Sequence, residues 1–365
     1  MSWAKTSPRV AVIVLNWNGW RDTVECLESL QQIRYPDYQI IVVDNGSTDG
    51  SVQKIQAWAR GDLPVVSAFV AYRRAIKPVV GISYDRAVAE HGGLDPTEAI
   101  LNGLPPSRRL VLVQTGANLG FSAGNNVALR YALKREFPLM LLLNNDTVVE
   151  PDFLSKLVQT LETDPRIVAV GPKILYKERP EAIWYAGAQL KLWRLTTRNI
   201  GIDQIDSNSW KGTHLTDQLS GCCFLARREL FERLGLLDED YFFGHEDAAY
   251  SCSIRRAGLL LAVNLDAVIY HKRGGSSESN GPIHVYYYCK NRLLVLKKQG
   301  SALEKILGLC FFTVSRPLKW TLLLLRGRCE VVAAELRAIR DFTLGRYGEF
   351  DRFEADRRSR SQRQS

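Results

Sequence analysis

Residues 10–44 read VAVIVLNWNGWRDTVECLESLQQIRYPDYQIIVVD, and this stretch decides the fold class. It begins with the aliphatic run VAVIVL and ends with a second one over Tyr38–Val43, each of strand length and rich in β-branched residues. Between them, apolar residues at helical spacing predict a helix, with Asp22 as N-cap and Glu25 three residues later. This strand–helix–strand order predicts a mostly parallel sheet covered by helices.

The same alternation continues along the chain. We expect a helix over Ser51–Ala59, a strand over Leu110–Gln114, a helix near Val127–Glu136, a strand over Leu139–Leu143 and a helix from Pro151 to about Glu162. Residues 60–109 carry scattered proline and glycine, and we interpret them as an insertion that serves as a lid or a partner surface.

Composition indicates an ordinary globular protein with an unusual charge distribution. The 365 residues are 46% hydrophobic and 24% charged, which excludes general disorder and low-complexity classes. The net charge is +9, and the segment from Lys290 onward, with 17 basic and 8 acidic residues, accounts for all of it. The C-terminal segment is therefore expected to have a role of its own.

Compartment signals favour the cytoplasm. Residues Met1–Pro8 are short and polar, so no signal peptide is expected. No uncharged apolar run reaches the ~18 residues that a membrane-spanning helix needs. The seven cysteines include no CxxC pair, which favours reduced thiols.

Polar clusters follow three predicted strands: NWN at 16–18, DN at 44–45 and NND at 144–146. Each cluster alone has the composition of a turn or a helix N-cap. Because the carboxyl ends of parallel strands face one crevice, the three together predict a ligand site.

The first clusters have the chemistry of a nucleotide site. The Asp44 carboxylate is able to accept a hydrogen bond from the imide N–H of uracil or thymine, and Trp17 to stack on such a base, with core packing as the alternative for Trp17. Residues 118–126 resemble a glycine-rich phosphate loop, in which Gly120 and Gly124 would permit close approach of a ligand. The loop matches neither GxGxxG nor a Walker motif, so an ATPase and a dinucleotide-binding fold are disfavoured.

The third cluster suits a divalent cation. Asp146 follows a buried strand, and His271 is a second potential ligand, with a structural histidine as the alternative. Lys272 and Arg273 would neutralise a diphosphate, and the mobile loop 274–277 would close over it.

Adjacent carboxylates at Glu246 and Asp247 follow an aromatic segment. Apolar walls and a like-charged neighbour raise the pKa of a carboxyl group, so the pair is a candidate for acid/base chemistry. The alternative, an N-cap for a helix over Ala248–Arg256, is compatible with that role.

In order along the chain, these segments resemble the inverting family 2 glycosyltransferases of GT-A fold, and within them the rhamnosyltransferase-like branch. The matching stretches are VAVIVLNWNG, IIVVDNGSTDGS, NLGFSAGNN, LLLNNDTVVEPDFL, SGCCFLARRELFERLGLLDEDYFFGHED and YHKRGGSS. The resemblance covers roughly residues 8–300 and implies a mixed, mostly parallel sheet flanked by helices. We expect a catalytic domain over 1–285, a helical appendage over 286–350 and a disordered basic tail over 351–365.

The resemblance also implies roles for individual residues. They are Trp17, Asp44, Asn118, Gly124, Asn145 and Arg273 for the nucleotide-sugar donor, Asp146 and His271 for Mg²⁺ or Mn²⁺, and Asp247 as general base. Transfer to an acceptor hydroxyl would then be one in-line displacement with inversion at the anomeric carbon. The resemblance favours dTDP-rhamnose as donor, with a UDP-sugar as the alternative.

Three positions depart from the family pattern. The metal motif has one carboxylate, Asp146, and Ala249 and Ser253 stand where the family often has Asp and Arg. These departures leave open a catalytically degenerate scaffold. A nucleotidyltransferase is disfavoured because no GxGxR-type loop occurs near the N-terminus.

The basic C-terminal segment combines ILGLCFF and LKWTLLLL, separated by residues 313–317. Arg316 and Pro317 argue against one spanning helix, and basic residues beside Trp and Leu favour a helix lying on an anionic membrane. Such contact would bring a lipid-linked acceptor to the enzyme. A helical hairpin on the catalytic domain, or a homo-oligomer interface, is the alternative, and the absence of a recognition motif disfavours nucleic acid.

Overall fold

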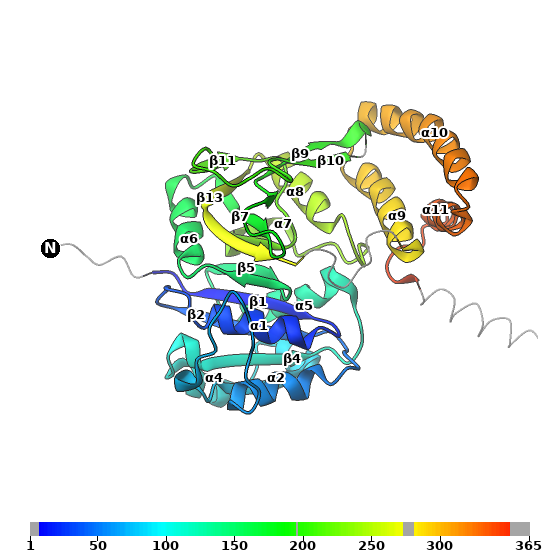
Figure 1. The fold of residues 1–365 in the computed structure, drawn as a ribbon. Helices are drawn as coiled ribbons and strands as arrows, with labels where there is room; N and C mark the ends of the chain where they lie inside the picture. The colour runs from blue at the N-terminus through cyan, green and yellow to red at the C-terminus, as the bar shows by residue number, and fades with distance from the viewer. Residues whose placement is uncertain (1–6, 195, 273–280, 351–365) are drawn as a thin grey trace, which may run out of the picture.

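The computed structural model describes residues 7–194, 196–272 and 281–350, which form a large sheet between helices, a small hairpin and a C-terminal helical group (Figure 1). The strands are β1 Val10–Asn16, β2 Tyr38–Asp44, β3 Val80–Asp85, β4 Arg109–Gln114, β5 Leu139–Asn144, β6 Thr147–Val149, β7 Ile167–Tyr176, β8 Ile183–Tyr185, β9 Ala188–Lys191, β10 Thr196–Asn199, β11 Thr213–Leu215, β12 Cys223–Arg227 and β13 Leu260–His271.

The α-helices are α1 Trp20–Leu30, α2 Ser51–Arg60, α3 Arg86–Glu90, α4 Asp95–Asn102, α5 Gly120–Lys134, α6 Phe153–Thr163, α7 Arg228–Leu234, α8 Glu246–Arg256, α9 Pro282–Gln299, α10 Ala302–Leu325 and α11 Cys329–Thr343. Short 3₁₀ helices are η1 Arg74–Ile76, η2 Pro106–Arg108 and η3 Leu192–Arg194.

The main sheet has the order β11-β13-β7-β12-β5-β1-β2-β4-β3, with β6 on β13 and β8 on β7. Strands β3, β4, β2, β1 and β5 form a parallel block, and β12 is antiparallel to both β5 and β7. Since β13 runs parallel to β7, it points the same way as β5. The expected mixed, mostly parallel sheet with C-terminal helices is confirmed.

Alternation along the buried strands separates the core into two layers. Val12 and Val14 of β1 pack with α1, α2 and α6, whereas Ala11 and Ile13 pack with α5, α7 and α8. Successive side chains of a strand point to opposite faces, so a strand without polar interruptions needs helices on both sides.

Two helices begin earlier than their sequences indicate. Helix α1 begins at Trp20 with Gly19 as N-cap, so Asp22 lies in the first turn instead of capping it. Helix α5 begins at Gly120, seven residues before the expected start, because Asn45 at the end of β2 accepts the N–H of its N-cap Leu119 and the Phe242 carbonyl accepts the N–H of Phe121. Residues 120–126 of the expected phosphate loop 118–126 are therefore helical.

The expected insertion, residues 60–109, is part of the sheet domain. Its strand β3 pairs with β4 and forms one edge of the main sheet. Buried Glu98 of α4 accepts hydrogen bonds from Tyr84 (3.0 Å) and from Tyr131 of α5 (2.8 Å). A lid is therefore the wrong interpretation for β3 and α4, which are fixed by backbone pairing and buried hydrogen bonds.

The C-terminal helices differ most from expectation. Helix α10 runs unbroken through Pro317, where two shorter segments were expected. Buried Glu335 of α11 binds Arg316 (3.3 Å), Lys319 and the indole N–H of Trp320 (2.7 Å), on both sides of the proline. These tertiary contacts offset the cost, about 3 kcal/mol, of a proline inside a helix.

Helix α10 lies outside the sheet domain, and η3 contacts it (Figure 1). Within the described ranges it is the one helix long and apolar enough to cross a membrane, by length and composition alone, at a mean hydropathy of 1.2.

Candidate functional site

Four strand ends meet at one edge of the sheet. In the parallel register Asn16 lies opposite Asp44, and Leu15 opposite Asn144. His271 ends β13, which points in the same direction, so it reaches the same edge. The sequence prediction that the polar clusters share one crevice edge is therefore correct in its geometry.

Asp44 is buried and held in a fixed orientation. Its Oδ1 accepts a hydrogen bond from Asn16 Nδ2 (2.8 Å), and its Oδ2 accepts one from the backbone N–H of Ser47 (3.1 Å). Thr23 in turn donates to Asn16 Oδ1 (2.8 Å). Each carboxylate oxygen keeps a further lone pair, so the group remains able to accept an N–H from a ligand.

Trp17 extends from the end of β1 and does not pack in the core. Trp17 is 42% exposed, which contradicts the alternative of core packing. The exposed indole lies one residue beyond Asn16, which binds Asp44 directly. A flat aromatic surface next to a hydrogen-bonding carboxylate suits a planar base.

The glycine-rich segment around Asn118 is bound to the protein itself. Asn45 Nδ2 donates to Asn118 Oδ1 (3.0 Å), and Asn45 Oδ1 accepts from the N–H of Leu119 (3.1 Å). Asn118 Oδ1 also accepts from the N–H of Gly120 (3.0 Å), and the N–H of Phe121 binds the carbonyl of Phe242 (2.7 Å). These N–H groups are occupied, so the phosphate-loop interpretation is wrong.

Gly124 serves helix packing. A Cβ there would lie 2.8 Å from Leu15 Cδ1 and 3.1 Å from Asn45 Nδ2. The close approach that its missing side chain permits is therefore between α5 and the ends of β1 and β2, where the sequence analysis expected a ligand.

Asp146 and His271 are brought together. Nε2 of His271 lies 3.2 Å from Oδ1 of Asp146, although 125 residues separate them, and both side chains are about seven-eighths buried. That Oδ1 atom accepts no hydrogen bond from the described residues. The ring of Trp184 packs on His271 at 4.8 Å between centroids, and Asn145 Nδ2 donates to Thr23 Oγ1 (2.9 Å).

The described residues contain no cluster of three or more His, Cys, Asp or Glu side chains arranged to hold a metal. A cation at Asp146 and His271 would therefore take its other ligands from water or from a bound diphosphate, which suits Mg²⁺ and Mn²⁺. The orphaned carboxylate oxygen next to an imidazole fits such an ion.

Lys272, expected to face a diphosphate, forms an ion pair with both carboxylate oxygens of Asp22 at 3.1 Å. Its side chain remains 44% exposed. Arg273 and the loop 274–277 lie outside the described residues, so their expected roles stay predictions.

Glu246 and Asp247 are the first two residues of α8, which begins two residues before the expected start at Ala248. The N-cap is His245, whose φ of 69° is in the left-handed region that few non-glycine residues adopt. Asp247 Oδ2 accepts from the N–H of Gly221 (3.0 Å), just before β12, and Oδ1 accepts from the N–H of Ala248 (2.7 Å). The carboxylates therefore occupy the first turn.

Burial governs the protonation of this pair. Desolvation raises the pKa of Glu246, and the nearby charge of Asp247 raises it further. Burial also raises the pKa of Asp247, opposed by hydrogen bonds from Gly221, Ala248 and the Gln218 side chain. Glu246 Oε2 has no hydrogen-bond partner among the described residues. Both carboxylate oxygens of Asp247 thus accept a backbone N–H, whereas Oε2 of Glu246 accepts none.

The two positions that depart from the family pattern face α9. Ala249 is buried in a cluster with Leu294 and Val295, and Ser253 Oγ accepts from Gln299 Nε2 (2.9 Å). A small residue at 249 and a hydroxyl at 253 therefore suit a covering helix.

Sequence reasoning missed Asn16 and Ser47 as the partners of Asp44. Asn16 stood in a quoted cluster, and the strand-end rule that selected Asp44 applied equally to it.

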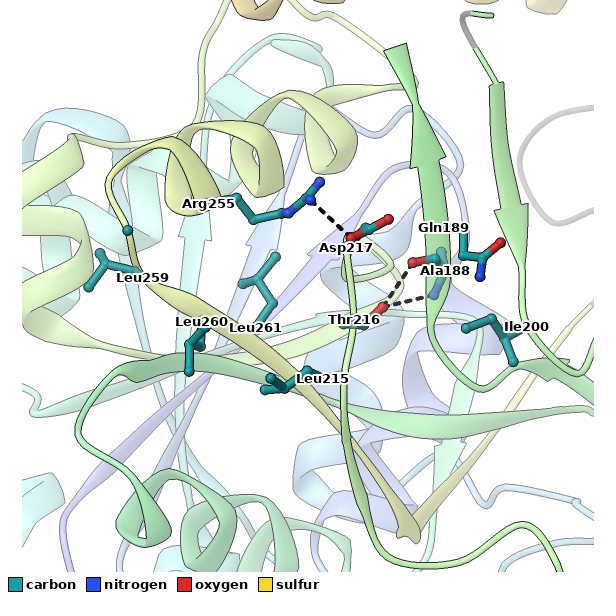
Figure 2. A pocket seen from close by; sticks show the side chains of 11 residues that line it. Ala188, Gln189, Ile200, Leu215, Thr216, Asp217, Arg255, Leu259, Leu260 and Leu261 are labelled. Carbon is teal, nitrogen blue, oxygen red and sulfur yellow. Dashed lines mark hydrogen bonds and ion pairs between the residues drawn. The ribbon is translucent and has the colours of Figure 1, made fainter.

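Two surface pockets lie away from these residues. One, of about 460 Å³, lies between β9, β11 and the end of α8, where Arg255 pairs with Asp217 at 3.1 Å (Figure 2). The other, of about 520 Å³, includes Lys173 and Trp210. Neither contains a predicted site residue.

Comparison with known proteins identifies the family of the chain. The family profile described as "Glycosyltransferase like family 2" matches residues 89–283, more than half of the chain, and "Glycosyl transferase family 2" matches 11–69. The dTDP-rhamnosyl transferase RfbF of Shigella flexneri is 23% identical over 195 residues, 51% of this chain and 63% of that protein. The match thus spans less than two thirds of that relative.

Two further comparisons cover more of the sequence. The N-acetylglucosaminyl-diphospho-decaprenol L-rhamnosyltransferase of Mycobacterium tuberculosis is 24% identical over 255 residues, 64% of this chain and 78% of that protein. The mannosyltransferase PcManGT from Pyrobaculum calidifontis, solved with GDP-Man and Mn²⁺, has a TM-score of 0.53 at 18% identity, covering 99% of this chain and 82% of that one. At that identity the structural likeness concerns the fold alone.

Proposed function

Because the chain belongs to glycosyltransferase family 2, we propose that it is an inverting glycosyltransferase that moves a sugar from a nucleotide donor to an acceptor hydroxyl. The observation that carries the proposal is the joint placement of Asp44, the Asp146–His271 pair and the end of β5 at one sheet edge. Asp247 adjoins that edge, because Gly221 binds its carboxylate and Cys222 binds the backbone of Asn144.

The donor we propose is dTDP-rhamnose. Asp44, fixed by Asn16 and Ser47, would accept the imide N–H of thymine, and Trp17 would stack on the ring. The names of the Shigella and Mycobacterium relatives support rhamnose. Uracil carries the same imide, so a UDP-sugar is the alternative that Asp44 does not exclude.

Asp146 and His271 would hold Mg²⁺ or Mn²⁺. When bound, the cation would stabilise the charge that develops on the diphosphate leaving group. The residues themselves provide a carboxylate oxygen without a hydrogen bond and an imidazole nitrogen, both largely buried. The Mn²⁺ in PcManGT supports a divalent metal in this fold.

Asp247 would act as general base on the acceptor hydroxyl. Burial raises its pKa, which makes the carboxylate a stronger base once it is ionised. Its hydrogen bonds from Gly221 and Ala248 fix the position of the carboxylate while they leave lone pairs for the acceptor proton.

The acceptor we propose is a lipid-linked saccharide in cell-surface glycan synthesis. A cytoplasmic enzyme would bind this acceptor at the inner face of the membrane. The exposed side of α10 supports this location because its large side chains are apolar. They are Leu303, Ile306, Leu307, Leu309, Val314, Leu318, Leu322, Leu324 and Leu325. Arg316 and Lys319 bind Glu335 on the opposite side, so α10 presents its apolar face outward.

The proposal is tested by thermal shift with dTDP, UDP and GDP and their sugars, each with and without Mn²⁺. A ligand at 100 times its Kd stabilises by about 2.7 kcal/mol, which is readily visible. We expect a Mn²⁺-dependent shift with dTDP ligands that Asp44→Ala and Asp146→Ala abolish. Asp49→Ala, a loop carboxylate outside the site, is the matched control and should keep the shift. The absence of any shift in the wild type would contradict the proposal.

The second candidate is a binding protein on a degenerate transferase fold. It is favoured by Ala249 and Ser253, which face α9, and by the single carboxylate at 144–146. Release of dTDP from dTDP-rhamnose in the presence of Mn²⁺ separates the two, because a scaffold binds the donor without cleaving it.

A further inference from the structure

Lys177 is the residue that follows β7, and it reaches the same sheet edge as the candidate site. Strand β7 runs parallel to β13, with Tyr176 opposite His271. The backbone N–H of Lys177 donates to the carbonyl of His271 (2.9 Å). In the same way, the N–H of Lys272 donates to the carbonyl of Asp146 (3.1 Å). Each member of the Asp146–His271 pair therefore has a lysine hydrogen-bonded to its backbone.

The side chains of both lysines are held by helix α1. The ammonium group of Lys177 forms an ion pair with Glu25. Lys272 binds both carboxylate oxygens of Asp22 at 3.1 Å. Since Asp22 and Glu25 are three residues apart, they lie on one side of the helix. The first two turns of α1 thus hold two cations beside the candidate metal residues.

The ion pair of Lys177 is the less exposed of the two. The side chains of Lys177 and Glu25 are 15% and 14% exposed, whereas that of Lys272 is 44% exposed. Ser67 Oγ donates to the second oxygen of Glu25 (2.6 Å). Within the described residues Glu25 is the one hydrogen-bond acceptor of the Lys177 ammonium group, which carries three N–H donors. Two of these donors are therefore left for an anion.

An anion that enters this edge of the sheet would compete with Glu25 for the ammonium group. The diphosphate of a nucleotide donor gains about one negative charge when its bond to the sugar breaks. A cation stabilises such a charge most effectively where water is scarce, which favours Lys177 over a fully solvated lysine. Until an anion binds, Glu25 balances the charge of the largely buried Lys177.

We propose that Lys177 binds the diphosphate of the donor, and that Glu25 holds the ammonium group in the empty protein and competes with the diphosphate for it. This inference rests on the proposed function, which provides a nucleoside diphosphate as ligand. The sequence analysis expected such a contact from Lys272, and Lys177 ends the neighbouring strand. The alternative is an ion pair that only fastens α1 to the sheet. In that case the loss of either partner would lower stability and leave the recognition of diphosphate unchanged.

The first test compares the dissociation constants of dTMP and dTDP by calorimetry in the presence of Mn²⁺. Their ratio measures what the second phosphate contributes. We expect Lys177→Met to weaken dTDP binding by about ten- to a hundredfold and dTMP binding by much less. Glu25→Gln should tighten dTDP binding by about two- to fivefold, because it removes the competing carboxylate. Opposite signs for the two partners of one ion pair are the signature of competition.

Three further variants exclude a general loss of structure. Lys177→Arg keeps the positive charge and should keep the wild-type ratio. Lys173→Met is the matched control, because Lys173 is a buried lysine of the same strand that pairs with Asp206 (2.7 Å). It should lower stability without changing the ratio. If Lys177→Met does not fold, the double variant with Glu25→Gln leaves no charge unpaired and should show the same low ratio.

Two results would overturn the inference. One is a ratio that Lys177→Met leaves at the wild-type value, and the other is a ratio that Glu25→Gln leaves unchanged or lowers. Either result, with a wild type that binds dTDP, would leave the proposed function standing.

The second test uses inorganic pyrophosphate, which has neither base nor sugar, in a thermal-shift measurement with Mn²⁺. We expect a rise in Tm for the wild type and for Lys173→Met, and none for Lys177→Met. A shift that depends on Lys177, in a wild type that binds no nucleotide, would refute the proposed function while the diphosphate site stood. A wild type that binds neither pyrophosphate nor dTDP would overturn both.

Discussion

Asp247 differs from its neighbour Glu246 in one respect that decides their roles. Gly221 and Ala248 donate to Asp247, whereas Glu246 Oε2 receives no hydrogen bond among the described residues. Donors stabilise the ionised form, so Asp247 is the residue equipped to act as a base near neutral pH. Glu246 is the one expected to stay protonated.

Asp247→Asn should lower transfer by about 10²–10⁴-fold, because it removes the base and keeps the shape of the side chain. Donor binding should persist, since Asp44 and Asp146 are untouched. The measurement is dTDP release alongside the thermal shift with dTDP and Mn²⁺. Asp266→Asn, an exposed residue on β13, is the control. Normal turnover by Asp247→Asn would show that another group is the base.

Glu246→Gln should flatten the pH dependence of stability. The pKa of Glu246 is raised in the folded protein, by burial first, so above the ordinary glutamate value the folded state binds more protons than the unfolded state. Stability is then lost as pH rises from about 4.5 towards the raised pKa. The variant lacks this loss and should gain about 1–3 kcal/mol relative to wild type at pH 8.

The gain should be absent at about pH 3, below the ordinary glutamate pKa of 4.5, where the carboxyl group is protonated in both states. Urea unfolding at the two pH values measures it, and Glu232→Gln on the surface of α7 is the control. If the free energies of unfolding of Glu246→Gln and wild type differed by the same amount at both pH values, the raised pKa of Glu246 would be ruled out.

The buried carboxylate of Glu335 holds helix α10 against α11. Glu335 of α11 is 2% exposed and binds Arg316, Lys319 and Trp320, so Glu335→Ala leaves two cations and an indole N–H without their partner. We expect a loss of about 2–4 kcal/mol. Faster hydrogen exchange over 302–325 should accompany it.

The control is Glu330→Ala, whose carboxylate is half exposed and paired with Arg328. An exposed pair contributes about 0–1 kcal/mol, so this variant should exchange like the wild type. Equal effects of the two substitutions would mean that Glu335 does not hold α10 across Pro317.

The sequence predicts a helix or strand correctly where the pattern that marks it is local. Strands β1, β2 and β5 are continuous aliphatic runs, and the structure places them within one residue of expectation. The start of α5 was missed because the partners of the N–H groups at its start, the Asn45 side chain and the Phe242 carbonyl, come from distant parts of the chain. Strand β3 was missed because it is mostly exposed and its partner β4 lies beyond two helices.

The candidate site residues also divide into those that a local pattern predicts and those that it does not. Asp44, Asp146 and His271 could be predicted because each ends a recognisable strand, and parallel strands deliver their ends to one edge. The roles of Gly124 and Lys272 could not, since they depend on which atoms fill the neighbouring space.

At the scale of the whole molecule, the C-terminal segment contacts the loop that precedes Glu246 and Asp247. Asn291 of α9 donates to the carbonyls of Phe243 (2.9 Å) and Gly244 (2.8 Å), directly before His245. Helix α9 therefore fixes the loop leading to Asp247, and α10 and α11 are attached through it (Figure 1). We infer that membrane contact through α10 would place the base at a defined height above the lipid.

The outward apolar face of α10 gives the last prediction. Its large exposed side chains are apolar apart from Lys319, and Arg326 and Arg328 lie beside its end, so the helix should bind vesicles rich in phosphatidylglycerol. Val314→Glu with Leu318→Glu, in the middle of that face, should abolish co-sedimentation, since burying two carboxylates in lipid costs several kcal/mol. The paired control Leu94→Glu with Ile100→Glu changes two equally exposed apolar residues of the sheet domain and should leave binding intact. Unchanged vesicle binding by the α10 variant would show that this face does not contact the membrane. A wild-type dimer that the same variant dissociates would show that the face contacts a second copy of the chain instead.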